Sequence, residues 1–343
     1  MVLNSAKLVW IGKVCAAVGL VALLLSDTEL ALSSASDGLA MWWERVLPGL
    51  FPFYVAVSIL FRLGAFRKLA QLTASPLPAC FLFGVLGGYP TGARLAGLMG
   101  VPGLGNGTNV CGVMFLKSVV ASGMFHAPGL FWPVALAHYG TALLFAFFRR
   151  GEVQVTHPVN EGKNEVGSLF ADIGEGMLVM LRIGGCMVFF TVCSSLLTEA
   201  FLKSASPLTK AILAGVTEMT KGCRDLSMLH LSPRLQAGLT AAILSFGGVC
   251  VLAQAKLVSP ELSMPSYFFS KLAQGCLAGI TAYAISPWFL METLPAMADR
   301  YGDYVDNALT GAAFLVCCGM GLGAAFLFGG VVSAGGEGKS FPP

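Results

Sequence analysis

The stretch Ala74-Ser75-Pro76-Leu77 recurs as Ala205-Ser206-Pro207-Leu208, an offset of 131 residues (205 − 74). Each copy stands directly before an apolar segment, at 77–100 and 208–225, that glycine, proline and polar residues interrupt. Irregular backbone at membrane depth persists only where protein or a water-filled cavity satisfies its polar groups. We therefore predict that each interrupted segment is a re-entrant hairpin or a broken helix.

Other positions match at the same offset, among them Glu44 with Glu175 and Gly84 with Gly215. Each half contains, in order, an amphipathic segment (39–47 and 170–178) that leads into a membrane span, an interrupted hairpin and two further spans. Three spans are an odd number, so the second copy would enter the membrane from the opposite side. Inverted repeats build many secondary transporters, which hold substrate near the midplane between discontinuous helices. A duplication that now serves only packing is the alternative.

The composition supports a membrane protein. Of 343 residues, 56% are hydrophobic and only 11% are charged, whereas soluble domains average about 25% charged residues. This hydrophobicity excludes disorder, and the ten cysteines lie in apolar runs without the spacing of a disulfide framework. The net charge of +3 is too small and dispersed for a nucleic-acid surface. We expect an all-α polytopic membrane protein.

A spanning helix needs roughly 20 mostly apolar residues, and about eight such stretches occur. They cover residues 8–25, 47–63, 110–125, 130–148, 183–201, 235–258, 267–285 and 308–332. The first could instead be a cleaved signal peptide, but an uncleaved helix fits better before so many later spans. Lysine and arginine in the loops are modestly more frequent on the side of the N-terminus, which favours both termini in the cytoplasm.

These features divide the chain into five parts. We expect an N-terminal transmembrane helix at 1–36, a first repeat at 37–150 and a cytoplasmic linker at 151–167. A second repeat follows at 168–288. The remaining residues, 289–343, hold an amphipathic segment, the last transmembrane helix and a short tail.

In the first half the interruption reads Gly87-Gly88-Tyr89-Pro90-Thr91-Gly92-Ala93-Arg94. Pro90 removes a backbone donor and disfavours helix at Tyr89. A half-helix beginning near Thr91 would direct free N–H groups and its positive dipole end at the break, which suits an anion or a carbonyl group. Arg94 would add a full charge. A simple kink, with Arg94 reaching to the membrane interface, is the alternative.

The corresponding segment of the second half is Thr217-Glu218-Met219-Thr220-Lys221-Gly222. Glu218 directly follows an apolar run, and a carboxylate at membrane depth is a functional candidate by default. We expect it to pair with Lys221 at i+3 or with Arg94 across the repeat interface, and it could carry a coupled proton. A structural ion pair between the hairpins is the alternative.

Further polar residues beside glycines follow each hairpin, where they could line a cavity or hold helices together. Lys117 lies inside an apolar span, so it must face protein or water, and we predict a second cation for an anionic substrate. His138 and Tyr139 we interpret as a packed hydrogen-bonding pair. The candidate substrate-binding residues are Gly88, Tyr89, Pro90, Thr91, Gly92, Arg94, Asn106, Asn109, Lys117, Glu218, Thr220, Lys221, Gly247, Gly248 and Gln254.

The sequence lacks the motifs of the common enzymes. There is no His-Glu-x-x-His and no Gly-x-Ser-x-Gly, and the tail 335–340 fails the spacing of a phosphate loop. We expect no catalytic residue, no metal and no cofactor. The expected partners are membrane lipids and a small anionic or nucleoside-like substrate, not nucleic acid, and a homo-oligomer is left open.

Three motifs together carry a family resemblance. They are Gly88-Tyr89-Pro90-Thr91-Gly92-Ala93-Arg94-Leu95, Glu218-Met219-Thr220-Lys221-Gly222 and Phe246-Gly247-Gly248-Val249-Cys250-Val251-Leu252-Ala253-Gln254. In this order they resemble the YlbJ-type sporulation integral membrane proteins of the wider nucleoside-recognition (Gate) group, over roughly residues 47–285. Cys111-Gly112 departs from that pattern, in which a proline follows an Asn- and Ser-rich segment.

The resemblance implies export of dipicolinic acid from the mother cell towards the forespore, across the outer forespore membrane. The Gate group is similar in repeat plan to concentrative nucleoside transporters, so nucleosides and other small metabolites stay open as substrates. A membrane scaffold that docks a sporulation partner without transporting anything is a hypothesis of a different class.

Overall fold

The computed structural model describes residues 5–148 and 168–290, and the regular secondary structure of this part is entirely helical, with no β-strand. The first half contains α1 (Ser5–Ser26), α2 (Thr28–Met41), the π-helix η1 (Trp42–Val46), α3 (Leu47–Arg62), α4 (Ala65–Leu72), α5 (Pro76–Gly87), α6 (Thr91–Leu98), η2 (Pro102–Leu104), α7 (Gly105–Thr108), the π-helix η3 (Phe115–Met124), η4 (Pro128–Leu130) and α8 (Phe131–Phe148). The second half contains α9 (Ser168–Phe201), α10 (Pro207–Thr217), α11 (Met219–Ser227), α12 (Pro233–Phe246), α13 (Gly248–Val258), α14 (Met264–Ile285) and α15 (Pro287–Leu290). The all-α expectation is confirmed for these residues.

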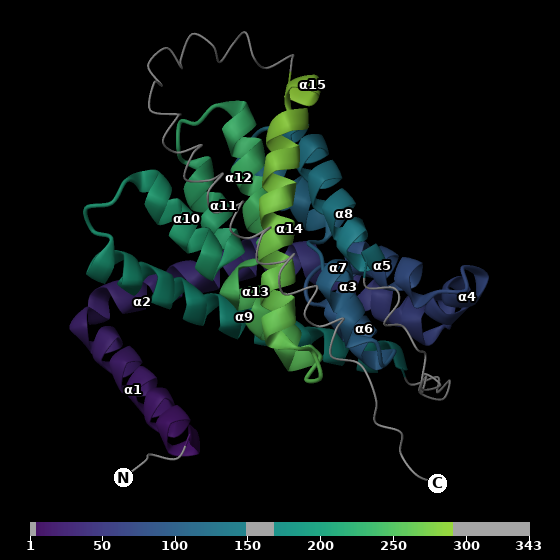
Figure 1. Cartoon of the computed structure of the whole chain (residues 1–343), viewed down its shortest axis with the longest axis horizontal. Coiled ribbons are helices and arrows are strands. Elements are labelled where there is room, and N and C mark those ends of the chain that lie inside the picture. Colours follow the sequence, from purple (N-terminus) through teal and green to yellow (C-terminus); the bar gives the residue numbers. More distant parts are fainter. Residues whose placement is uncertain (1–4, 149–167, 291–343) are drawn as a thin grey trace.

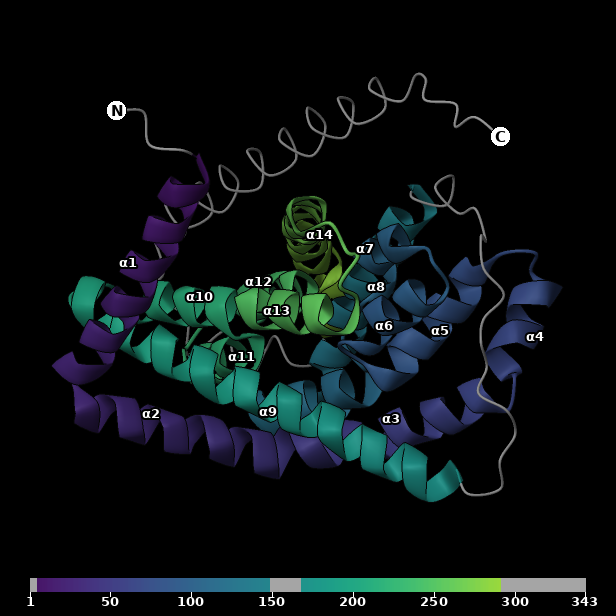
Figure 2. The same cartoon turned by 90° about the horizontal axis from the view of Figure 1, so that it is seen from below.

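Two long helical runs lie side by side along one side of the molecule (Figure 2). α2, η1 and α3 form one continuous run, Thr28–Arg62, which packs against α9. Arg62 pairs with Asp172 near the start of α9, whereas Gly38 packs against Thr191 further along it, so the runs are antiparallel. The predicted amphipathic segment at 39–47 and the predicted span at 47–63 therefore belong to a single helical run that begins at Thr28.

Both interrupted segments fold as pairs of short helices, as predicted. Ser75 and Ser206 cap the first helix of each pair, and a proline at the first helical position fits the fixed φ of that residue. Across each break the two helices approach through glycines. A Cβ atom added to Gly222 of α11 would lie 2.2 Å from Cα of Gly215 of α10, and one added to Gly84 of α5 would lie 3.5 Å from Cα of Gly92 of α6.

The predicted count of eight spans is not confirmed. Within the described ranges four segments are long and apolar enough to cross a bilayer, namely Thr28–Arg62, Pro128–Phe148, Leu169–Phe201 and Pro233–Val258. The last of them breaks into α12 and α13, because Gly247 and Gly248 adopt positive φ angles of 82° and 75°. The stretch 110–125 begins irregularly and continues as η3, 267–285 lies in the 22-residue α14 and 8–25 lies in α1. The stretch 308–332 and the linker 151–167 lie outside the described residues.

The core is formed where the two halves meet. α14 packs against α12 and also against α8 of the first half, and the three helices run together in Figure 1. In Figure 2 α14 is seen nearly end-on while α9 lies across the view, so these two helices cross. α1 stands apart and exposes Trp10 and Val18, which fits a helix in contact with lipid.

Candidate functional site

A fully buried lysine lies where the irregular segment after α7 meets α14. The ammonium group of Lys271 donates hydrogen bonds to the carbonyl oxygen of Asn109 at 2.6 Å, Oε1 of Gln274 at 2.9 Å and the hydroxyl of Tyr89 at 3.4 Å. It also lies 5.3 Å from the ring centre of Tyr89 and 6.0 Å from that of Tyr267. Buried charges are normally paired, yet no carboxylate in the described part of the chain is within ion-pair distance of Lys271.

Asn109 connects this lysine with the first hairpin. Its Oδ1 accepts from the backbone N–H of Ala93 in the first turn of α6 at 3.3 Å, and its Nδ2 donates to the hydroxyl of Tyr267 at 2.6 Å. One asparagine thus satisfies a free donor at the start of a half-helix while its own carbonyl accepts from Lys271. The half-helix predicted to begin near Thr91 is present, and its N-terminus faces this site.

His138 and Tyr139 of α8 hold the irregular segment in place. Nε2 of His138 accepts from the backbone N–H of Cys111 at 3.0 Å, so the neutral ring carries its proton on Nδ1, which lies 2.7 Å from Oγ of Ser245. The hydroxyl of Tyr139 donates to the carbonyl of Cys111 at 3.0 Å. The two rings pack against each other with centroids 4.9 Å apart, as predicted, but these hydrogen bonds join them to Cys111 and Ser245 rather than to each other.

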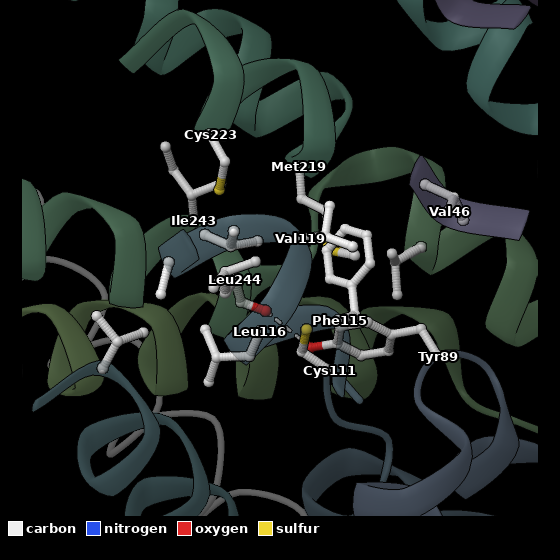
Figure 3. Close-up of a cluster of buried hydrophobic side chains, with 14 of the residues drawn as sticks. Val46, Tyr89, Cys111, Phe115, Leu116, Val119, Met219, Cys223, Ile243 and Leu244 are labelled. Atoms are coloured by element: carbon white, nitrogen blue, oxygen red, sulfur yellow. Dashed lines mark hydrogen bonds between the residues drawn. The ribbon is translucent and has the colours of Figure 1, made fainter. Parts of the chain in front are cut away.

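The breaks of the two hairpins each contribute a side chain to one large buried cluster. Figure 3 shows Tyr89, which precedes Pro90, in the same cluster as Met219, which follows Glu218. The Tyr89 hydroxyl donates to the carbonyl of Leu244 in α12 at 2.9 Å. Residues from both halves therefore surround one point inside the protein.

The partners predicted for Glu218 are wrong. Its buried carboxylate caps α11, accepting from the backbone N–H groups of Thr220 at 3.0 Å and Lys221 at 2.7 Å. Lys221 pairs with Asp225 one turn further on, and Arg94 pairs with Glu175 of α9. The free N–H groups of α11 are the nearest donors to the carboxylate, so they satisfy it without a cation.

This capping role leads to a stability prediction. Glu218→Ala removes both acceptor oxygens and should lower the free energy of unfolding by about 1–2 kcal/mol. Glu218→Gln keeps one acceptor and should cost clearly less. Thermal unfolding of the two variants in detergent measures the difference. A glutamine variant as unstable as the alanine variant would show instead that the charge is what the fold requires.

The other candidates divide into buried and exposed residues. Lys117 is exposed on η3, while its neighbours Phe115 and Leu116 face the core, so Lys117 is not part of the site. The ten-residue π-helix turns more slowly than an α-helix, which changes the face that each position presents. Asn106 and Gln254 are buried, with Nδ2 and Nε2 donating to Oγ of Ser266 at 3.4 Å and Sγ of Cys250 at 3.2 Å.

The remaining predicted residues are packing positions around the breaks. Thr91 and Thr220 are buried, and Oγ1 of Thr91 has no hydrogen-bond partner in the described part of the protein. A Cβ atom on Gly92 would lie 1.9 Å from the carbonyl oxygen of Thr108, and one on Gly248 would lie 3.0 Å from that of Gly215. Gly88 and Gly247 have the positive φ angles at which glycine is favoured.

Sequence reasoning missed Lys271, together with its neighbours Tyr267 and Gln274. The signal was present, because Lys271 lies inside the predicted span 267–285 and an ionisable residue at membrane depth is a functional candidate. Ser245 and Tyr54 carried no comparable signal, since single hydroxyl groups are common in apolar helices.

Comparison with known proteins gives one curated relative. The chain is 24% identical over 321 residues to the sporulation integral membrane protein YlbJ of Bacillus subtilis (strain 168), a match that covers 76% of this chain and 79% of the relative. No family profile matches the sequence, and no solved structure is significantly similar. The match to an integral membrane protein agrees with the apolar helices described above. The comparison confirms that this chain is similar to the YlbJ-type sporulation integral membrane proteins, as its motifs predicted.

Proposed function

We propose that this protein is a membrane transporter for a small anionic metabolite, with Lys271 as the residue that attracts the anion. The observation that carries the proposal is the buried ammonium group, which has three oxygen partners and no carboxylate among the described residues. An uncompensated charge in a low-dielectric interior is costly. A bound anion would supply the missing countercharge.

The cations that the sequence analysis predicted for the site support Lys271 as the anion-binding residue by elimination. Arg94 and Lys221 already have carboxylate partners, Glu175 and Asp225, and Lys117 is exposed. Next to Lys271, Nε2 of Gln274 is a buried donor that has no hydrogen-bond partner among the residues that the structure describes. A carboxylate substrate could accept from both groups at once.

The two halves support a transporter architecture. Each contains a long helix, a hairpin broken at its tip, a further interrupted helix and a closing helix, and the elements follow the same order. This order fits two inverted repeats around a midplane site. By resemblance, dipicolinate is the substrate and the outer forespore membrane is the location, and the distribution of lysine and arginine in the loops favours cytoplasmic termini.

The test is uptake into proteoliposomes containing the full chain. We expect saturable uptake of labelled dipicolinate that excess unlabelled dipicolinate inhibits, and no uptake of labelled uridine. Uptake of uridine alone would make the protein a nucleoside transporter. If neither compound enters, although the protein is folded, the scaffold hypothesis replaces the proposal.

A further inference from the structure

Two arginines occupy equivalent places in the hairpins. Gly92-Ala93-Arg94 in α6 resembles Gly222-Cys223-Arg224 in α11 at an offset of 130 residues, one less than that of the Ala-Ser-Pro-Leu repeat, and each glycine lies close to a glycine in the first helix of its own hairpin, Gly84 or Gly215. Arg94 pairs with Glu175 of α9, the long helix of the second half. Arg224 lies 3.7 Å from Asp37 of α2, in the long helix of the first half. Each hairpin is therefore fastened to the long helix of the opposite half.

The two pairs lie at opposite ends of the long helices. The Arg94 guanidinium contacts Tyr54 of α3, and the helical run from Asp37 to Tyr54 covers about 25 Å at roughly 1.5 Å per residue. The hydrocarbon core of a bilayer is about 30 Å thick. If the long helices, which are long and apolar enough to cross a bilayer, run across it, one pair lies towards each face.

The Arg94 end is closed. Arg94 bonds Glu175, donates to the hydroxyl of Tyr54 at 2.8 Å and lies 5.7 Å from the centre of that ring. Tyr54 is buried beneath it, and the Arg62–Asp172 pair lies about one helical turn away along α9. Three contacts thus hold the tip of the first hairpin on the long helices.

The Arg224 end borders a cavity. A cavity of about 430 Å³ lies between α2, η1, η3 and α11. It is lined by Arg45, Arg224 and His126, and by the carboxylates Asp37 and Glu44. Apart from the Arg224–Asp37 pair, the same elements are joined at this end by a hydrogen bond of 3.0 Å from Arg45 to the carbonyl of Gly123.

An apolar plug separates this cavity from the lysine. The helices that line the cavity also contribute buried side chains deeper in the protein. These belong to one cluster and are Val46 of η1, Phe115 and Val119 of η3, and Met219 and Cys223 of α11 (Figure 3). The same cluster contains Tyr89 and Cys111. Tyr89 accepts from Lys271, and Cys111 lies two residues beyond Asn109, so the plug leads from the cavity to the lysine site.

We propose that the cavity is the aqueous access to the Lys271 site from one side of the membrane, and that Arg94–Glu175 is the closed gate on the other side. Both pairs are formed in this structure, which is therefore closed at both ends, and each step of transport would break one pair while the other stays formed. Arg45 at the mouth, whose guanidinium bonds a backbone carbonyl, gives the access route a cation that attracts an anion. This inference rests on the proposed transport function, but its test needs no substrate.

The test uses Cys223 in the plug as a reporter of opening. Full-length protein in proteoliposomes is treated with N-ethylmaleimide, and labelling of each cysteine is followed by peptide mass spectrometry. Cys80 is the internal control, because it is equally buried but lies in a separate cluster. We expect Cys223 to react faster than Cys80, since the plug opens to the cavity.

Isosteric changes in the two pairs should then act in opposite directions. Glu175→Gln weakens the Arg94–Glu175 pair and so favours the state that is open at the Arg94 end. The labelling of Cys223 should then slow by about two- to fivefold, the range expected for an exposed ion pair. Asp37→Asn weakens the other pair and should speed the labelling by a similar factor. Glu199→Gln, in the exposed Glu199–Lys203 pair of α9, should leave it unchanged.

Cys223 labelling equal to that of Cys80 in every variant would overturn the proposal. If Glu175→Gln and Asp37→Asn both changed the rate of Cys223 labelling in the same direction, the proposal would also be overturned, because that result indicates a general loosening of the fold. Opposite changes in the labelling rate without dipicolinate uptake would support the two gates and reject dipicolinate as the substrate. Dipicolinate uptake without opposite changes in the labelling rate would reject the gates and leave the transport proposal standing.

Discussion

Replacing Lys271 with methionine is expected to abolish dipicolinate uptake while the protein stays folded. Methionine is close to lysine in length but carries no charge, so the carbonyl of Asn109 and Oε1 of Gln274 lose their donor and an anion loses its countercharge. Removing one member of a desolvated charge pair typically costs 3–5 kcal/mol. Uptake at low substrate concentration should therefore fall by about 100-fold or more.

The control is Lys117→Met, which removes the same charge from the exposed side of η3 and should leave uptake unchanged. Thermal unfolding in detergent distinguishes lost function from lost folding, because a buried cation without a carboxylate partner contributes little net stability. Equal uptake by the Lys271→Met variant and the unsubstituted protein would remove Lys271 from the site. Equal loss in both lysine variants would show that total charge matters rather than position.

The sequence was informative where a residue restricts its own backbone. Gly88 and Pro90 mark a break that the structure confirms, because glycine and proline act through local φ and ψ angles that need no knowledge of the fold. The break at Gly247-Gly248 was not predicted, since 235–258 was expected to be one continuous span. The Ser-Pro starts of α5 and α10 are local in the same way.

The partners of the charged side chains could not be predicted from the sequence, because they depend on which donors and acceptors lie closest in three dimensions. Glu218 had two plausible cations in sequence, yet the N–H groups of its own helix satisfy it. Lys117 was expected at the site because it lies in an apolar span, yet on η3 its side chain is exposed. Lys271 also lies in a predicted apolar span, but only its contacts show that it is the central charge.

Replacing Gly92 with alanine should be the most disruptive single-methyl change at the site. A Cβ atom there would lie 1.9 Å from the carbonyl oxygen of Thr108, 2.4 Å from its carbonyl carbon and 2.7 Å from Cα of Asn109. All three are backbone atoms, so no side-chain rotation relieves the overlap. Overpacking of this kind costs about 1–3 kcal/mol and sometimes more.

The displaced residue would be Asn109, which binds Lys271, Tyr267 and the start of α6, so Gly92→Ala should lower both the melting temperature and uptake. Gly140→Ala in α8 is the matched control, since no atom lies within 4 Å of its added Cβ and alanine favours helix by up to about 1 kcal/mol. Differential scanning fluorimetry in detergent should therefore separate the two variants by several degrees. Equal melting temperatures would mean that α6 can move away from Asn109 without cost, and then Asn109 could not hold the lysine site in a fixed geometry.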